Sequence, residues 1–250
     1  MNRNAHMPLK AHTRQHGFNI VELMVAITIS LILLAGVAQL FLSNKASHNV
    51  QNGKGLLQEN ARFALEALAT GIVTAGYDIR SLSDTAAKLD LAATQDNAVE
   101  NATLSFTMAS GRASDNIAVV HSAATDCMGM ATGGLTTDLY YINGTTLMCL
   151  GSGGTAGVIA DGVENMQILY GLDTDADDIA NSFVSAASLN TGNVNNVVSV
   201  KIALLVSTVD TVGQNAPGDY TVLNAPALGP FTDNRLRQVF SRTILLRNRV

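Results

Sequence analysis

An apolar run near the N-terminus limits what this chain can fold into more than any other feature. It extends over 20 residues, from Leu23 to Leu42, and its exceptions are Thr28, Ser30, Gly36 and Gln39. An α-helix rises about 1.5 Å per residue, so a helix of this length spans roughly 30 Å, the thickness of the hydrocarbon core of a bilayer. The run therefore predicts a membrane-spanning helix.

The charges on either side of the apolar run predict its orientation. Arg3, Lys10 and Arg14 precede the run without any acidic residue among the first 17, and Lys45 alone follows closely. Cytoplasmic flanks of membrane helices carry the excess of Lys and Arg. We therefore expect the N-terminus in the cytoplasm and residues 44–250 on the other side of the membrane.

An ionisable residue, Glu22, lies at the start of the apolar run. A carboxylate inside a membrane helix costs on the order of 2.5–3.5 kcal/mol, which favours a functional role with an ionic partner. Glu22 can alternatively extend to the headgroups from the end of the helix, and the segment is then a plain anchor. A cleaved secretory signal is a third interpretation, although its apolar core has only about 7–15 residues.

The segment GFNIVELMVAI, residues 17–27, resembles the type III signal of type IV pilins and of the pseudopilins of type II secretion. In that pattern a basic leader ends in Gly and is followed by Phe, by Glu at the fifth mature position and by an apolar helix. Gly17, Phe18 and Glu22 match it. The resemblance implies that a prepilin peptidase cleaves between Gly17 and Phe18 and N-methylates Phe18. Asn19 replaces the usual Thr or Ser, but Asn is also a good helix cap.

The same resemblance gives Glu22 a partner. Cleavage would create a cationic amine at Phe18, and Glu22 of one subunit can pair with the terminal amine of its neighbour. In a low dielectric such a pair is far stronger than in water, and an unpaired charge is correspondingly costly. We expect Glu22 to set the register between packed helices during pilus assembly.

A narrower apolar stripe continues the helical pattern beyond the apolar run. It recurs every three or four residues and consists of Leu57, Ala61, Ala64, Leu68 and Ile72. This spacing predicts an amphipathic helix that covers a sheet. NGKG, residues 52–55, predicts a weak point or kink because each glycine costs about 1 kcal/mol in a helix interior. Gly76 predicts the end of the helix.

The remainder of the chain alternates strand-like runs with polar turns. A small, polar stretch at 81–98 is predicted to be a loop with a short helical piece. The runs after it are 102–108, 116–122, 138–142, 145–150, 163–172, 196–208 and 238–247. Asn143-Gly144 between two of them predicts a hairpin with a type I′ turn. We predict an α+β, type IV pilin-like fold in which a long N-terminal helix packs on an antiparallel sheet.

These patterns and the resemblance together predict four segments. The resemblance implies that residues 1–17 are a cleaved leader and that 18–43 are the transmembrane and filament-core helix. Residues 44–76 are predicted to be the amphipathic half of the same helix, and 77–250 are predicted to be a β-rich periplasmic head.

The chain has two cysteines: Cys127 precedes the first strand of the predicted hairpin, and Cys149 lies on its second strand. In an exported domain they predict one disulfide, which contributes roughly 3 kcal/mol through chain entropy; two unpaired thiols are the alternative. Zinc needs more ligands than two cysteines, and no histidine lies beside them at ligand spacing. His121 is expected to be an ordinary strand residue.

An acidic segment, DTDADD, occupies residues 173–178. Asp173, Asp175 and Asp177 match the first three ligand positions of an EF-hand loop and offer the oxygens that calcium prefers. The sixth position is Asp178 instead of Gly, and the twelfth is Val184 instead of Glu. The segment is interpreted first as a solvated acidic turn, with a weak calcium site as the alternative. No other cofactor is expected.

Neither enzymatic nor nucleic-acid-binding signals are present. No G-x-S-x-G, H-E-x-x-H or P-loop motif occurs, and the glycine-rich stretch at 151–157 is predicted to be a flexible turn. The net charge is −5, and removal of the first 17 residues leaves 12 basic and 20 acidic residues, a net −8. Phosphate binding needs clusters of Lys and Arg, so no nucleic-acid partner is expected.

Further segments resemble the PilW type of minor pilin. They are residues 59–77, 163–178, 197–208 and 242–250. The resemblance implies a structural, non-catalytic protein that takes part in initiation and assembly of a type IV pilus and in its tip complex. Its implied partners are other minor pilins, the major pilin, the prepilin peptidase and the inner-membrane assembly platform. Two alternatives are a minor pseudopilin of type II secretion and a membrane-anchored adhesin or binding protein.

Overall fold

The structure is a computed structural model of the 250-residue chain. It describes residues 17, 19–78, 95–98, 100–101, 106–107, 113–190, 192–212 and 218–248. The chain divides into two compact units, Met1–Ser47 and His48–Val250, and each unit is considered by itself.

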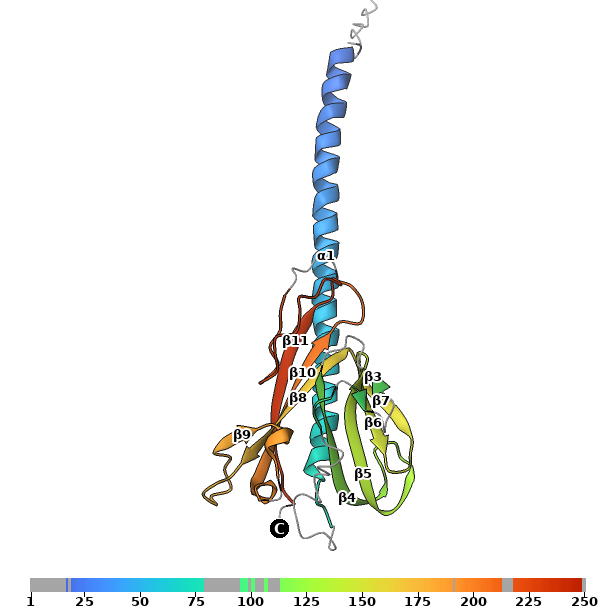
Figure 1. Cartoon of the computed structure of the whole chain (residues 1–250). Coiled ribbons are helices and arrows are strands. Elements are labelled where there is room, and N and C mark those ends of the chain that lie inside the picture. The colour runs from blue at the N-terminus through green and yellow to red at the C-terminus, as the bar shows by residue number, and fades with distance from the viewer. Residues whose placement is uncertain are drawn as a thin grey trace, which may run out of the picture. The chain divides into compact units, whose positions relative to one another are not determined.

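A single long helix, α1 (Ile20–Val73), contributes to both units (Figure 1). It continues without interruption through residues 52–55, so the helix is not broken at NGKG. The glycine at 53 has a packing role instead: a Cβ atom there would lie 2.6 Å from Cγ1 of Val212. The helix ends three residues before Gly76, which has φ 78° and donates its N–H to the Val120 carbonyl at 2.8 Å.

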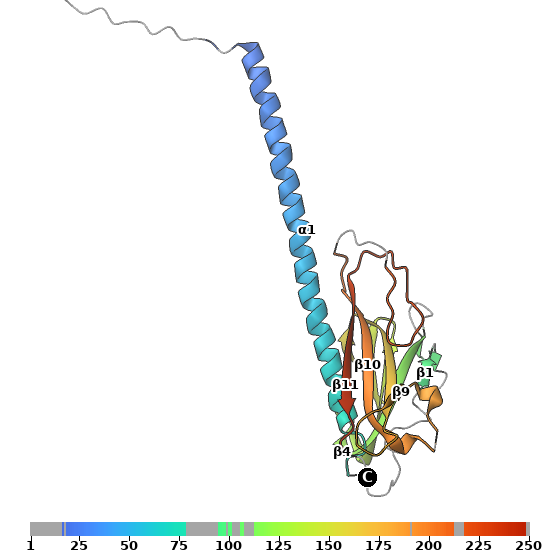
Figure 2. The same ribbon diagram turned by 90° about the vertical axis from the view of Figure 1, so that its left-hand side faces the viewer.

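The strands form two main antiparallel sheets, whereas the sequence predicted one. The first has the order β1–β4–β5–β6–β7, with β1 (Gln95–Ala98), β4 (Ser114–Thr125), β5 (Ala131–Asn143), β6 (Thr146–Gly151) and β7 (Ala156–Asp161). The second has the order β11–β10–β8–β9, with β8 (Val163–Leu172), β9 (Ser182–Val184), β10 (Val197–Ser207) and β11 (Arg237–Leu245). In Figure 2 this sheet is spread across the view, with β11 at the left and β9 at the right. A two-stranded piece pairs β2 (Glu100–Asn101) with β3 (Phe106–Thr107). The α+β class is confirmed.

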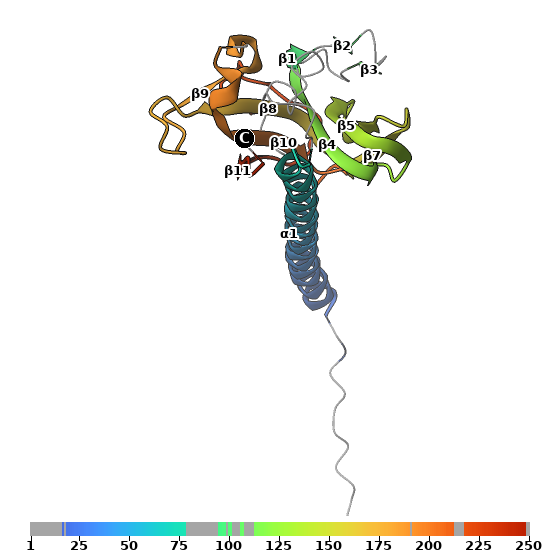
Figure 3. The same ribbon diagram turned by 90° about the horizontal axis from the view of Figure 1, so that it is seen from below.

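Polar side chains at the start of β4 explain why the sheets are separate. The Ser114 hydroxyl accepts the N–H of Met166 at 2.9 Å and donates to its carbonyl at 3.0 Å. The Asp115 carboxylate accepts the N–H of Ile168 at 2.7 Å. These side chains satisfy the edge of β8 where a backbone ladder would otherwise continue. The two sheets therefore meet through side chains and fan out on two sides of the C-terminal part of α1 (Figure 3).

The predicted apolar stripe of α1 lies in a core that both sheets share. Its five residues are at most 2% exposed. They pack with Ile117 and Val119 of β4 and with Ile202 and Leu204 of β10. Truncation of a buried leucine to alanine in such a core costs about 2–5 kcal/mol. The stripe predicted from sequence is confirmed.

A second apolar cluster covers the opposite face of β10. Ala203 and Leu205 pack there against Val222 and Leu228 of the segment before β11. Burial on both faces accounts for the continuous apolar sequence of β10, since a strand with one solvated face would alternate.

An ion-pair cluster holds the start of β11. Arg237 is 9% exposed, binds the Glu164 carboxylate through two nitrogens at 2.7 and 2.8 Å, and binds Asp233 at 2.6 Å. Its guanidinium lies 3.7 Å from the ring centre of Phe231. Hydrogen bonding to Arg237 lowers the pKa of Asp233 to about 2.

Several local predictions need correction. The hairpin of β5 and β6 is present, but Asn143 pairs with Thr146 and the turn is Gly144-Thr145. Gly144 has φ 65° and Asn143 is not among the positive-φ residues, so the type I′ turn at Asn143-Gly144 is wrong. β7 begins within the stretch predicted as a flexible turn, and β1 lies within the predicted loop at 81–98. Most of the predicted strand at 102–108 falls outside the described residues.

Candidate functional site

The N-terminal motif leads directly into α1. Gly17 is exposed, and Phe18 lies outside the described residues. Asn19 stands immediately before the helix; its side-chain oxygen accepts the N–H of Val21 at 3.5 Å, and its carbonyl accepts the N–H of Leu23 at 3.1 Å. Asn19 therefore occupies the capping position expected from its residue type.

Glu22 lies in the first turn of α1 and is exposed. An acidic side chain there interacts favourably with the positive end of the helix dipole. Among the described residues, no cation forms an ion pair with it. Two other polar residues of the apolar run differ in this respect: Thr28 donates to the Val25 carbonyl at 2.8 Å, and Ser30 donates to the Ala26 carbonyl at 2.7 Å. These hydroxyls are satisfied within the helix, whereas no hydrogen bond to the Glu22 carboxylate is found among the described residues.

The part of α1 that follows Glu22 is apolar and exposed. In the part of the chain that the structure describes, α1 is the one helix long and apolar enough to cross a membrane. Its large apolar side chains between Ile20 and Leu42 are each at least half exposed. In water such a surface would be costly, so the segment requires lipid or other apolar helices around it.

The predicted disulfide between Cys127 and Cys149 is confirmed. It joins the turn after β4 to β6, with a Cα–Cα distance of 6.5 Å. The neighbouring Asp126 organises the same turn. Its carboxylate accepts the N–H groups of Met128 and Met130, each at 2.9 Å, and that of Gly153 at 2.9 Å. Burial acts to raise the pKa of Asp126, but these three donors outweigh it and hold the pKa below its usual value.

A second carboxylate, that of Asp138 on β5, lies against the disulfide. It accepts the N–H of Cys127 at 3.0 Å and lies 3.8 Å from Nε2 of His121. Burial raises its pKa, against the opposing effects of that N–H and of His121. His121 lies on strand β4, as expected. It is buried, and Nδ1 of its ring has no hydrogen-bond partner among the described residues.

The acidic segment forms the loop between β8 and β9. Asp173, Asp175 and Asp177 each offer an oxygen within 4.8 Å of the other two. Both oxygens of Asp173 already accept backbone N–H groups, from Asp175 at 3.1 Å, Ala176 at 2.7 Å and Asp178 at 2.8 Å. These bonds account for the buried Asp173 without a cation, although they leave the carboxylates of Asp175 and Asp177 available. The calcium alternative thus stays a prediction.

The predicted residues of the head do not converge on one centre. The disulfide belongs to the first sheet, and the acidic loop belongs to the second. Among the described residues, grooves are present that sequence patterns did not indicate, and two of them are described here.

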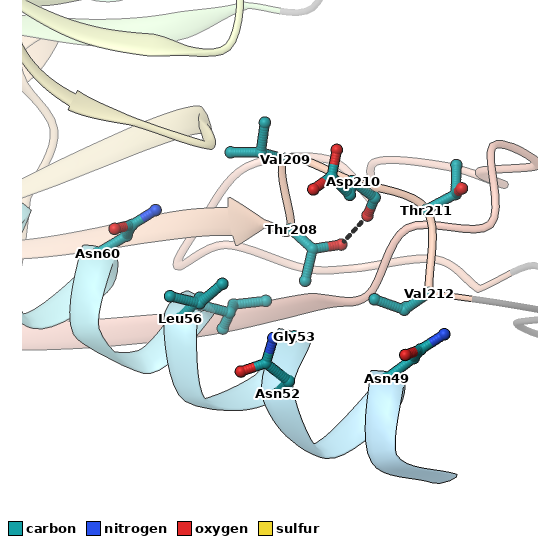
Figure 4. A pocket seen from close by; sticks show the side chains of 11 residues that line it. Asn49, Asn52, Gly53, Leu56, Asn60, Thr208, Val209, Asp210, Thr211 and Val212 are labelled. Atoms are coloured by element: carbon teal, nitrogen blue, oxygen red, sulfur yellow. Dashed lines mark hydrogen bonds between the residues drawn. The ribbon is translucent and has the colours of Figure 1, made fainter. Parts of the chain in front are cut away.

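The first groove, here called the amide groove, has a volume of about 480 Å³ and is drawn in Figure 4. Its helix side carries Asn49, Asn52, Leu56 and Asn60, and its other side is the segment 208–212 after β10. The Thr208 hydroxyl donates to the Asp210 carbonyl at 2.8 Å and keeps that segment turned along the helix. Side-chain amides both donate and accept hydrogen bonds, so this lining indicates no single ligand class.

The second groove, here called the acidic groove, has a volume of about 610 Å³. Its helix side consists of Phe63, Glu66, Ala67, Thr70, Gly71 and Thr74. Its sheet side consists of His121, residues 125–128, Asp138, Tyr140, Val158 and Ile159. The groove therefore contains the carboxylates beside the disulfide. Its residues lie far apart in the sequence, which is why local motifs gave no signal for it.

Two family models match the chain. The one described as Type IV Pilus-assembly protein W matches residues 136–248, and the one described as Prokaryotic N-terminal methylation motif matches residues 12–38. No curated protein matches. Among solved structures, a type IV-like pilin from Thermus thermophilus is 17% identical, with a TM-score of 0.47; the match covers 77% of this chain and 98% of that one.

Proposed function

We propose that the chain is a minor pilin of the PilW type and that it takes part in initiating and assembling a type IV pilus. The observation that carries the proposal is the occurrence of both family matches in one chain, the methylation motif at 12–38 and the PilW match at 136–248. A position in the tip complex is the finer part of the proposal and follows from the resemblance to minor pilins.

The N-terminal helix and the methylation motif indicate that the protein is anchored in a membrane. We place the N-terminus in the cytoplasm and the head in the periplasm of the bacterial inner membrane, because Arg3, Lys10 and Arg14 precede the span. The protein would leave this location for the pilus when the helix is taken up into the filament.

The proposed processing step creates the charge that Glu22 lacks. A prepilin peptidase cleaves between Gly17 and Phe18 and methylates the new amine. The amine remains cationic after methylation, and it lies close to the start of the apolar helix. Glu22 of one subunit then pairs with the amine of a neighbour. The exposed Glu22 in the first turn of α1 supports this role.

The proposed role is structural and non-catalytic, without a resident cofactor. Its partners are other minor pilins and the major pilin, besides the peptidase and the inner-membrane assembly platform. Apolar burial in the filament drives the packing of the helices, and the ion pair sets their register, because an unpaired charge in that environment is strongly disfavoured.

Deletion of the gene, scored for both piliation and protein secretion, tests the proposal. We expect loss of surface pili and of twitching, restored by the intact gene, with normal secretion. Loss of secretion with normal pili would identify a pseudopilin instead. An adhesion defect with normal pili and normal secretion would identify an anchored adhesin.

A further inference from the structure

The acidic groove contains more negative charge than its own residues neutralise. Glu66 is paired with Arg242 of β11. Asp138 has only His121 at 3.8 Å, and Asp126 is bound by backbone N–H groups alone. Within the described residues, no Lys or Arg lies within ion-pair distance of Asp126 or Asp138. A carboxylate that is bound only by backbone N–H groups keeps its full charge, so the groove attracts a cation.

Metal ions fit this groove poorly. The described acidic and histidine side chains around Asp126, Asp138 and His121 do not bring three ligand atoms together. Asp138 does lie beside the sulfurs of Cys127 and Cys149, but both sulfurs are committed to the disulfide. Cysteine binds a metal through its thiolate, and a disulfide has no thiolate to offer. An organic cation, the ammonium of Lys or the guanidinium of Arg, suits the site better.

The rims of the groove are apolar on both sides. Phe63 on α1 is 59% exposed, and Val158 on β7 is 58% exposed. A small free cation would leave both side chains in water. A polypeptide segment that crosses the groove would cover both of them and gain hydrophobic stabilisation in proportion to the area buried.

The wall that carries Val158 is an unprotected edge strand. β7 pairs with β6 and, in the described part of the chain, with no other strand. Edge strands are commonly protected by lysine, proline or inward-pointing charges. The sequence of β7, AGVIAD, contains none of these before its last residue, Asp161. An extended segment can therefore add its backbone alongside β7 and place alternate side chains in the groove.

We propose that the acidic groove docks an extended segment of another pilin, which inserts a Lys or Arg side chain between apolar neighbours. The identity of the partner as a pilin rests on the proposed function. The chemistry of the docked segment follows from the carboxylates, the apolar rims and the free edge of β7. The disulfide fixes Cys127 to β6, and the Cys127 N–H binds the Asp138 carboxylate at 3.0 Å next to Asp126.

Photo-crosslinking in cells that carry the full-length chain tests this docking. Benzoylphenylalanine replaces Phe63, and the matched control replaces Leu135, which is 52% exposed on β5 and lies outside the groove. We expect position 63, and not position 135, to crosslink to another pilin. Mass spectrometry should map the crosslink to a peptide that contains Lys or Arg.

Two further variants test the chemistry. Val158→Lys places on the rim a positive charge that repels the Lys or Arg of the docked segment. Asp138→Asn removes one carboxylate while keeping an acceptor for the Cys127 N–H. Each variant should reduce the yield of the crosslink at least about tenfold. A tenfold change corresponds to the smallest coupling energies measured for close charge pairs at interfaces. Leu135→Lys, the control, should leave it unchanged. Formation of the Cys127–Cys149 disulfide in each variant verifies that the head has folded.

The outcomes separate this proposal from the proposed function. A crosslink to lipid only, to a second copy of this chain, to a segment without basic residues or to no polypeptide overturns the docking proposal. So does a crosslink that Val158→Lys and Asp138→Asn leave unchanged in folded protein. A crosslink to a basic segment of a protein that is not a pilin also overturns the docking proposal and leaves the proposed function standing, whereas normal piliation and twitching after deletion of the gene would contradict the proposed function alone.

Discussion

The contact between Gly71 of α1 and Tyr140 of β5 allows a quantitative test of how the helix packs on the first sheet. A Cβ atom added at Gly71 would overlap the Tyr140 hydroxyl and lie 2.7 Å from Cζ and 3.0 Å from Cε2. Carbon atoms normally approach to about 3.5–4.0 Å, so the tyrosine ring would have to move by about 1 Å. Tyr140 is only 4% exposed, which leaves the ring little room.

The expected magnitude follows from two opposing effects of Gly71→Ala. Overpacking costs about 1–3 kcal/mol, and replacing a helical glycine by alanine gains about 1 kcal/mol. Gly55 provides a matched control in the same helix because nothing lies within 4 Å of its added Cβ. The propensity gain is common to both variants, so their difference isolates the overpacking. Gly55→Ala should raise the free energy of unfolding of the head by about 1 kcal/mol. The free energy of unfolding of Gly71→Ala should be about 1–3 kcal/mol lower than that of Gly55→Ala.

Thermal unfolding of the full-length chain in detergent, followed by tyrosine fluorescence, measures this difference. The chain has five tyrosines and no tryptophan, and all five tyrosines lie in the head unit. For a unit of this size 1 kcal/mol corresponds to about 2–4 °C in Tm. Adding Tyr140→Phe to Gly71→Ala removes the overlapping hydroxyl and should recover part of the loss. Equal stabilisation by Gly71→Ala and Gly55→Ala would refute the packing described here.

Three further predictions concern charged residues. Glu22→Ala should leave cleavage after Gly17 intact but lower incorporation into pili; normal incorporation of the cleaved variant would remove the pairing role. The depressed pKa of Asp233, about 2, means that its stabilisation is present above pH 4 and is lost as the pH falls from about 4 to 2. Because Asp233 is 44% exposed, we expect a loss of only about 1 kcal/mol, which Asp233→Asn should abolish in acid unfolding curves. Calorimetric titration of calcium should give no heat at millimolar concentration if Asp173 serves only to shape its loop, whereas heat that Asp175→Asn removes would establish the calcium site.

The features that could be predicted from the sequence are those that leave a regular spacing of apolar residues. The stripe from Leu57 to Ile72 follows helical spacing, and every member is buried. Most predicted strands appear within a few residues of their expected bounds, because apolar runs between polar turns reflect burial directly. The disulfide was predictable since an exported domain with two cysteines has one pairing available.

The features that the sequence did not predict depend on contacts between distant segments. The separation into two sheets rests on Ser114 and Asp115 bonding to β8, more than 50 residues away. Glycine is needed at position 53 of the helix because Val212 packs closely against it. The acidic groove is formed by residues of α1, β4, β5 and β7. The hairpin was found but its turn was placed one residue early, because Asn-Gly pairs favour a type I′ turn and cross-strand pairing here puts the positive φ at Gly144 alone.

The state of the chain in the filament tests the central claim most directly. Pili sheared from cells that contain the protein should include it as a mature chain whose N-terminal peptide begins with N-methylated Phe18. Mass spectrometry of those pili measures both its presence and its processing. Pili that lack the chain although it is present in the membrane, or a chain in pili that still begins before Phe18, would contradict the account.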